Sequence, residues 1–202
     1  MGGNGVYSAS RRAYEAYEVT SIGSIAKYTS GSRSDSVTTY KEHEKEVERL
    51  INAAWQEFRA KQTEENYYET IGRLIESYSP EGRITAEFRA KPLAKELLAG
   101  EKLAANGHIL VYLAQTDDGK HADILMDGVQ TDIKRIESSK RGKVYQRIKD
   151  AAKQADAVVI DLTLRTISVA DAVSKAKEAL DNGVLRRGSI TILDWEGNET
   201  KL

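Results

Sequence analysis

The sequence predicts an α/β sandwich with a mixed sheet, preceded by a helical N-terminal segment. Three observations lead to this prediction: a hairpin signal at Asp127-Gly128, a continuous apolar run at 157–162 typical of a buried strand, and helical spacing of apolar residues around both. From Pro92 onward the predicted order of elements is α-β-β-β-α-β-α-β.

Composition limits the classes of protein to which the chain could belong. Its 202 residues allow one domain of ordinary size, or a core with an accessory segment. The absence of cysteine excludes disulfides and thiolate chemistry. No run approaches the roughly 18 apolar residues of a membrane-spanning helix, and the N-terminus lacks a signal-peptide pattern. We therefore expect a soluble chain without a membrane segment, whose export depends on a signal outside this chain.

The N-terminal part is predicted to be a tail followed by two helices. Residues 1–38 are rich in Gly, Ser and Thr, which favours a flexible tail or linker. Thr39 and Glu42 form a capping box that predicts the start of the first helix, and the second follows Thr63. Residues 39–84 are thus expected to form an αα-hairpin. Its tyrosines fall in register with aliphatic residues, which favours packing over stacking on nucleic-acid bases.

Residues 85–202 are predicted to form the α/β domain. Its first helix spans about 85–106, with Pro92 marking a break. A helix capped by Ser168 lies near the C-terminus and ends at 182–183. The other expected elements are a strand at 109–114, hairpin strands at 122–126 and 129–134, a helix at 142–155, and strands at 157–162 and 189–194.

The hairpin gathers charged side chains on one face. Asp-Gly suits a type I′ turn, which needs positive φ at both central positions. Because side chains alternate along a strand, Asp132 and Lys134 share one face, and the hairpin brings Asp123 close to it. Two carboxylates and an ammonium group are costly to gather in a core unless something binds there. An exposed pair on an edge strand is the alternative interpretation of Asp132 and Lys134.

The segment after the hairpin is locally basic, although the whole chain has a formal charge of −1. Residues 130–153 contain eight basic and three acidic side chains, a local balance of +5. We expect Arg135, Lys143 and Arg147 to bind the phosphates of a nucleic acid, the alternative being a solvated helix face.

The same residues carry a resemblance to a known group of enzymes. Asp123 followed by Asp132-Ile133-Lys134, in this order of elements, resembles the PD-(D/E)XK nuclease superfamily. More narrowly, the chain resembles C-terminal toxin nucleases of bacterial contact-dependent growth inhibition systems and related polymorphic toxins, through the run AANGHILVYL, GKHADILMDGVQTDIKRI and ADAVVIDL. Several of those toxins cleave tRNA. Ala122 departs from the pattern, since many members have a structural proline there.

The resemblance implies a metal-dependent nuclease toxin that cleaves RNA, with tRNA favoured. It implies that Asp123 and Asp132 hold Mg²⁺, or another divalent cation such as Mn²⁺ or Zn²⁺, and that Lys134 orients the attacking water or stabilises the transition state. The superfamily usually adds a glutamate from the preceding helix. Glu96 is slightly favoured as a catalytic residue, and Glu101 is the alternative metal ligand. Gln146 is the candidate polar residue from the helix after Lys134.

The resemblance also implies partners and a place of action. A cognate immunity protein is expected, together with delivery by a system outside this chain and action in the cytoplasm of a target bacterium. Two alternatives remain open: a DNA endonuclease of the same fold, and a non-catalytic structural or interaction module of a phage or mobile element.

Other polar residues near these elements have simpler interpretations. Asp161 could join the site, although it more readily caps the loop that follows its strand. His121 is expected to be solvated, and His108 has no partner at a useful spacing in the sequence.

Overall fold

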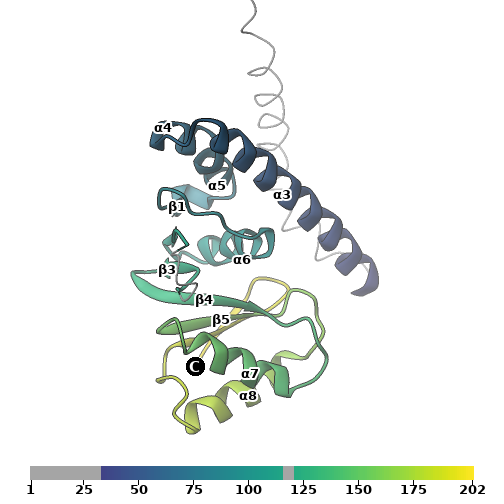
Figure 1. Cartoon of the computed structure of the whole chain (residues 1–202). Helices are drawn as coiled ribbons and strands as arrows, with labels where there is room; N and C mark the ends of the chain where they lie inside the picture. Colours follow the sequence, from purple (N-terminus) through teal and green to yellow (C-terminus); the bar gives the residue numbers. More distant parts are fainter. Residues whose placement is uncertain (1–32, 116–120) are drawn as a thin grey trace, which may run out of the picture.

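The computed structural model describes residues 33–115 and 121–202, and a seven-stranded mixed sheet lies at their centre (Figure 1). The strands lie side by side in the order in which they occur in the chain. The β1–β2, β4–β5 and β5–β6 pairs are parallel, and the other three pairs are antiparallel. The strands are β1 (Ile84–Ala86), β2 (Leu110–Tyr112), β3 (Ile124–Met126), β4 (Val129–Arg135), β5 (Ala157–Asp161), β6 (Ile190–Leu193) and β7 (Glu199–Lys201).

The predicted α/β class is confirmed, and the hairpin forms where it was expected. Asp127 and Gly128 have φ angles of 51° and 81°, so both central positions adopt the left-handed region that a type I′ turn requires. Met126 pairs directly with Val129 across this turn. The turn therefore fixes the register of β3 against β4, which determines the side chains that share a face.

Helices cover both faces of the sheet. In Figure 1, α3 and α6 lie on one side of β4 and β5, and α7 and α8 lie on the other. The longer helices are α3 (Arg33–Lys61), α6 (Ala94–Ala105), α7 (Gly142–Ala151) and α8 (Val169–Asp181). Short turns follow α3, namely α4 (Glu64–Tyr67), the π-helical η1 (Tyr68–Gly72), α5 (Arg73–Ser77) and the 3₁₀ turn η2 (Pro80–Gly82).

Of the three helix starts predicted at Thr39, Thr63 and Ser168, two are confirmed and one is wrong. The Thr63 hydroxyl accepts from the Asn66 backbone N–H at 3.2 Å, and the Ser168 hydroxyl accepts from the Asp171 N–H at 3.1 Å. By contrast, Thr39 lies inside α3, because the helix already begins at Arg33. Residues 33–38 are therefore helical rather than part of a tail, and the rest of the predicted tail, residues 1–32, lies outside the described residues.

The two outermost strands were not predicted. The helix predicted from about residue 85 does not start there: residues 84–86 form β1, and α6 begins only after Pro92, at Ala94. Residues 199–201 form β7 against β6. Both strands are three residues long, so each is held mainly by pairing with its neighbour rather than by a sequence pattern of its own.

The hydrophobic core has one layer on each face of the sheet. On β5, Val159 packs into the layer beneath α3 and α6, whereas Val158 and Ile160 pack into the layer beneath α7 and α8. The first layer is a single cluster of contacting side chains, whose members come from segments between Tyr40 and Leu193. The predicted boundary at residue 85 therefore does not separate two cores, and the N-terminal helices share the core of the α/β part.

Close packing of α6 on β2 depends on a glycine. A Cβ atom at Gly100 would overlap the hydroxyl of Tyr112. That hydroxyl donates to the Glu96 carbonyl at 2.8 Å, which fixes the first turn of α6 against the sheet.

None of the helices in the described residues has the length and the apolar character that a membrane span requires.

Candidate functional site

The charged face of the hairpin forms a compact polar site. Asp132 on β4 is completely buried, and the Lys134 ammonium lies 2.7 Å from its carboxylate. Only 22% of the Lys134 side chain is exposed. The two side chains lie close together, as predicted. They are not an exposed pair on an edge strand, because Asp132 is fully buried and a buried carboxylate requires hydrogen-bonding or charged partners.

Asp123 completes a carboxyl pair with Asp132. The two side chains are hydrogen-bonded to each other, and the Ile133 N–H donates to Asp123 Oδ2 at 2.8 Å. Burial, together with the neighbouring Asp132, raises the pKa of Asp123 to about 9. Burial also acts to raise the pKa of Asp132, but hydrogen bonds from Asp123 and Lys134 outweigh it and lower that pKa. The pair therefore holds one proton between two carboxyl groups at neutral pH.

Glu96 is the acidic residue of α6 that reaches this site. It lies in the first turn, where its Oε2 accepts from the Leu93 N–H at 2.9 Å and caps the helix. Burial raises its pKa, and it interacts with the charges of Lys134 and Asp132. Glu101 was predicted as the alternative metal ligand, and that role stays a prediction. Glu101 is buried further along α6, where burial raises its pKa to about 7.

Gln154, in the turn after α7, is the glutamine that contacts Asp132, whereas Gln146 was predicted to be the polar site residue from this helix. The Gln154 amide donates to Asp132 Oδ2 at 2.8 Å. The predicted Gln146 is exposed and donates instead to Asp150 at 3.0 Å, one helical turn along. Gln154 reaches Asp132 because α7 connects the parallel strands β4 and β5, so the chain after the end of the helix returns beside Asp132. The role of Gln146 stays a prediction.

Arg135 was expected to bind substrate phosphates, and the structure contradicts this. Its side chain is 2% exposed and forms ion pairs with Asp161 at 2.9 Å and with Glu44 at 2.7 Å. Alternation of side chains along β4 indicates this burial in the sequence. Arg135 lies on the same face as Thr131 and Ile133, and Lys134 lies on the opposite face. Asp161 caps its loop as expected, accepting from the Thr163 N–H at 2.9 Å.

The predicted basic face of α7 is exposed. Lys143 and Arg147 both lie in solvent on this helix, as does Lys149. Their exposure fits either a phosphate-binding surface or a solvated helix face, so their role in binding stays a prediction.

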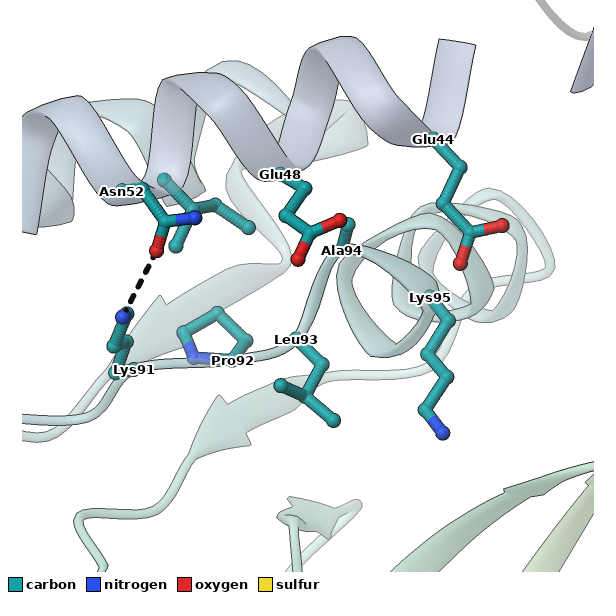
Figure 2. Close-up of a pocket in the computed structure, with 9 residues that line it drawn as sticks. Glu44, Glu48, Asn52, Lys91, Pro92, Leu93, Ala94 and Lys95 are labelled. Carbon is teal, nitrogen blue, oxygen red and sulfur yellow. Dashed lines mark hydrogen bonds between the residues drawn. The ribbon is translucent and has the colours of Figure 1, made fainter. Parts of the chain in front are cut away.

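A groove of about 310 Å³ lies between α3 and the segment that leads into α6. Figure 2 shows Glu44 and Glu48 projecting from α3 toward this segment, with Lys91 bonded to Asn52 at one end and Lys95 at the other. Asp123, Asp132 and Lys134 do not line it. The groove is thus not part of the carboxyl-pair site.

Among residues 33–115 and 121–202, no three His, Cys, Asp or Glu side chains already lie together as a metal-binding group. Asp123 and Asp132 nevertheless offer hard carboxylate oxygens of the kind Mg²⁺ prefers, and they share a proton that a cation could replace. These two carboxylates are the oxygen donors that the site offers, with Glu96 as a neighbouring acidic group.

The fold and the site together define a mixed α/β domain with an acidic, lysine-containing site on a β-hairpin. Residues 120–198 match the model of the family described as contact-dependent growth inhibition CdiA C-terminal domain, and this stretch includes the hairpin, α7, β5, α8 and β6. The match leaves out α3 and α6.

A solved structure also shows similarity to this chain. It is the CdiA-CT/CdiI toxin and immunity complex from Burkholderia pseudomallei, with 20% identity and a TM-score of 0.45, over 55% of this chain and 83% of that one. No curated protein matches the chain.

Proposed function

We propose that this chain acts as the nuclease toxin of a contact-dependent growth inhibition system and cleaves RNA, with tRNA as the favoured substrate. The observation that carries the proposal is the convergence of Asp123, Asp132 and Lys134 with Glu96 in one partly buried site. The family match over residues 120–198 supports the toxin part, and the sequence resemblance to tRNA-cleaving toxins supports the choice of RNA.

In this proposal Asp123 and Asp132 hold Mg²⁺, or Mn²⁺ or Zn²⁺ in its place. When bound, the ion supplies positive charge to the phosphoryl oxygens and lowers the pKa of a bound water. The Lys134 ammonium, 2.7 Å from Asp132, donates to a phosphoryl oxygen or orients the attacking group, which for RNA includes the ribose 2′-hydroxyl. Gln154 holds the second oxygen of Asp132 and so fixes the orientation of that carboxylate.

The biological part of the proposal follows from the same resemblance. A system outside this chain delivers the toxin, which acts in the cytoplasm of the target bacterium. A cognate immunity protein is the expected protein partner. A scaffold without activity would have no use for a buried carboxyl pair matched to a lysine, since such a site costs stability.

A cleavage assay tests the enzymatic part. Purified protein is incubated with tRNA and, separately, with plasmid DNA, in Mg²⁺ or in chelator. We expect tRNA cleavage that chelator abolishes, and a loss of at least about 100-fold in Lys134→Ala, the order expected for a charge-stabilising group. Lys175→Ala, a matched lysine change on α8, should cleave normally. Cleavage of DNA but not of tRNA would show that the substrate is DNA. Equal cleavage rates for Lys134→Ala and Lys175→Ala would show that Lys134 has no catalytic role.

Expression in bacterial cytoplasm tests the toxin part. The wild-type chain should arrest growth, and Asp123→Asn should not, because it loses one of the two carboxylates. Similar growth of the two strains at matched protein levels would leave a non-catalytic module as the better account.

A further inference from the structure

Arg135 lies at the centre of a buried polar cluster on the face of the sheet opposite Lys134. Its guanidinium donates to Asp161 on β5 at 2.9 Å, and to Glu44 and the Tyr40 hydroxyl on α3, both at 2.7 Å. It also stacks on the Tyr40 ring, 5.3 Å from the centroid. A fourth hydrogen bond, at 3.4 Å, goes to the Lys95 carbonyl on α6. One side chain therefore connects α3, α6, β4 and β5.

The cluster is adjacent in the chain to two candidate catalytic groups. Arg135 directly follows Lys134, and Lys95, whose carbonyl it holds, directly precedes Glu96. The hydrogen-bond network continues from Asp161 to α6. The other oxygen of Asp161 accepts from the Thr163 hydroxyl at 2.5 Å, and that hydroxyl accepts from Lys102 at 2.8 Å. Displacing Arg135 would shift the backbone that carries both Lys134 and Glu96.

We infer that Arg135 is a positioning residue, which uses Tyr40 and Glu44 of α3 to hold Lys134 and Glu96 in register across the sheet. The inference rests on the proposed nuclease function. It makes α3 a functional part of the catalytic unit, although α3 lies outside the stretch that matches the toxin family.

Physical chemistry favours orientation over simple stabilisation as the role of this cluster. A buried ion pair often contributes no more stability than well-packed apolar residues of the same volume, because its charges lose their hydration. Its advantage is geometric, since a planar guanidinium has five donors in fixed directions. Here those donors engage partners on three other elements. Arginine also keeps its charge at any pH at which the protein is folded.

The experiment compares two glutamates on the same side of α3. Glu44 accepts a hydrogen bond from Arg135, whereas Glu48, one turn further along, projects toward the groove (Figure 2) and is not among the hydrogen-bond partners of Arg135. Glu44→Ala and Glu48→Ala change charge and helix propensity equally. Tyr40→Phe provides a second variant that keeps the ring and removes the hydroxyl. Each is made in the full chain and assayed below its melting temperature.

Two readouts distinguish positioning from stability. In fully folded Glu44→Ala we expect kcat for tRNA cleavage to fall at least about tenfold with KM nearly unchanged, since small displacements of reacting groups are costly. Glu48→Ala should match the wild type. Amide hydrogen exchange, measured without substrate, should accelerate at residues 94–97 and 133–136 in Glu44→Ala and Tyr40→Phe.

Two results would overturn the inference: a folded Glu44→Ala with wild-type kcat, or unchanged exchange in these two segments. A wild-type chain that cleaves neither RNA nor DNA would overturn the proposed function instead, and hydrogen exchange would still decide whether Arg135 has its positioning role.

Discussion

His108 connects the hairpin turn to the last strand of the sheet. Its Nδ1 lies 2.5 Å from an Asp127 carboxylate oxygen, and its Nε2 lies 2.9 Å from Glu199 on β7. The sequence showed no partner for this histidine, because Asp127 and Glu199 are 19 and 91 residues away. Burial alone would lower the His108 pKa, but the two carboxylates outweigh it and raise that pKa.

The raised pKa predicts that this contact weakens in alkali. The protonated ring is favoured in the folded state, so its contribution is complete below the unfolded pKa of about 6.5 and is lost as pH rises through the raised value. We expect His108→Gln to lower the free energy of unfolding on the order of 1 kcal/mol at pH 6, and by less at pH 9.

Urea unfolding at both pH values measures this difference. His121→Gln is the matched control, since its ring contacts the neighbouring Ala122 carbonyl. An equal loss at pH 6 and pH 9 would show that His108 acts through packing and not through its charge.

At the scale of residues, the sequence predicted the centre of the site better than its surroundings. Asp123, Asp132 and Lys134 could be predicted because the Asp-Gly turn fixes the register of the hairpin. Gln154 could not, since it lies in a turn whose path depends on the packing of α7. Glu96 and Glu101 lie on the same helix beside the same apolar stripe, and only the tertiary arrangement of α6 distinguishes them.

At the scale of elements, the exposed face of α7 gives a test of substrate binding. Lys143 and Arg147 are one turn apart on one face of the helix, and Lys149 lies on a different face. We predict that Lys143→Ala with Arg147→Ala weakens tRNA binding and reduces its salt dependence by about two phosphate contacts. Lys149→Ala should have a much smaller effect.

This binding is measured with the Asp123→Asn chain, so that RNA stays intact, across a series of salt concentrations. Turnover at saturating tRNA should be retained in the double variant, because phosphate contacts position the substrate and do not act on the reacting phosphate. A double variant with the parental salt slope would show that the basic face is merely solvated.

Element prediction succeeded where a local signal was strong. The β5 strand, five buried residues long, and the Ser168-capped α8 were both recognisable from sequence alone. By contrast, β1 and β7 have three residues each, and β7 consists of Glu, Thr and Lys, which have no strand pattern. These strands exist because β2 and β6 offer a free edge, and such an edge is a property of the assembled sheet.

At the scale of the whole molecule, the N-terminal helices belong to the same folding unit as the sheet. Their large buried side chains are part of the core layer that also contains Leu97, Leu110 and Ile124. These side chains are Val47, Ile51, Phe58, Tyr67, Ile71, Leu74, Ile75 and Tyr78. Each contributes about 2 kcal/mol when fully buried, so together they match or exceed the roughly 5–15 kcal/mol by which a domain is usually stable.

We therefore predict that a fragment of residues 83–202, which retains β1 and every later element, does not fold by itself. It should show no cooperative thermal transition by circular dichroism. A fragment of residues 33–202 should melt like the full chain, since it keeps the complete core layer. A shorter fragment that melts cooperatively at the temperature of the full chain would contradict this prediction.

The order of the strands affects how the chain can reach this structure. Each strand of the sheet pairs with the strands immediately before and after it in the chain, from β1 to β7. No strand must insert between two others that have already paired, so the sheet can grow in one direction as successive segments become available. The bonds from Arg135 to Glu44 and Tyr40, 91 and 95 residues apart, are by contrast long-range closures. Folding of the sheet therefore meets few topological obstacles, and the docking of α3 is the step with the longest loop to close.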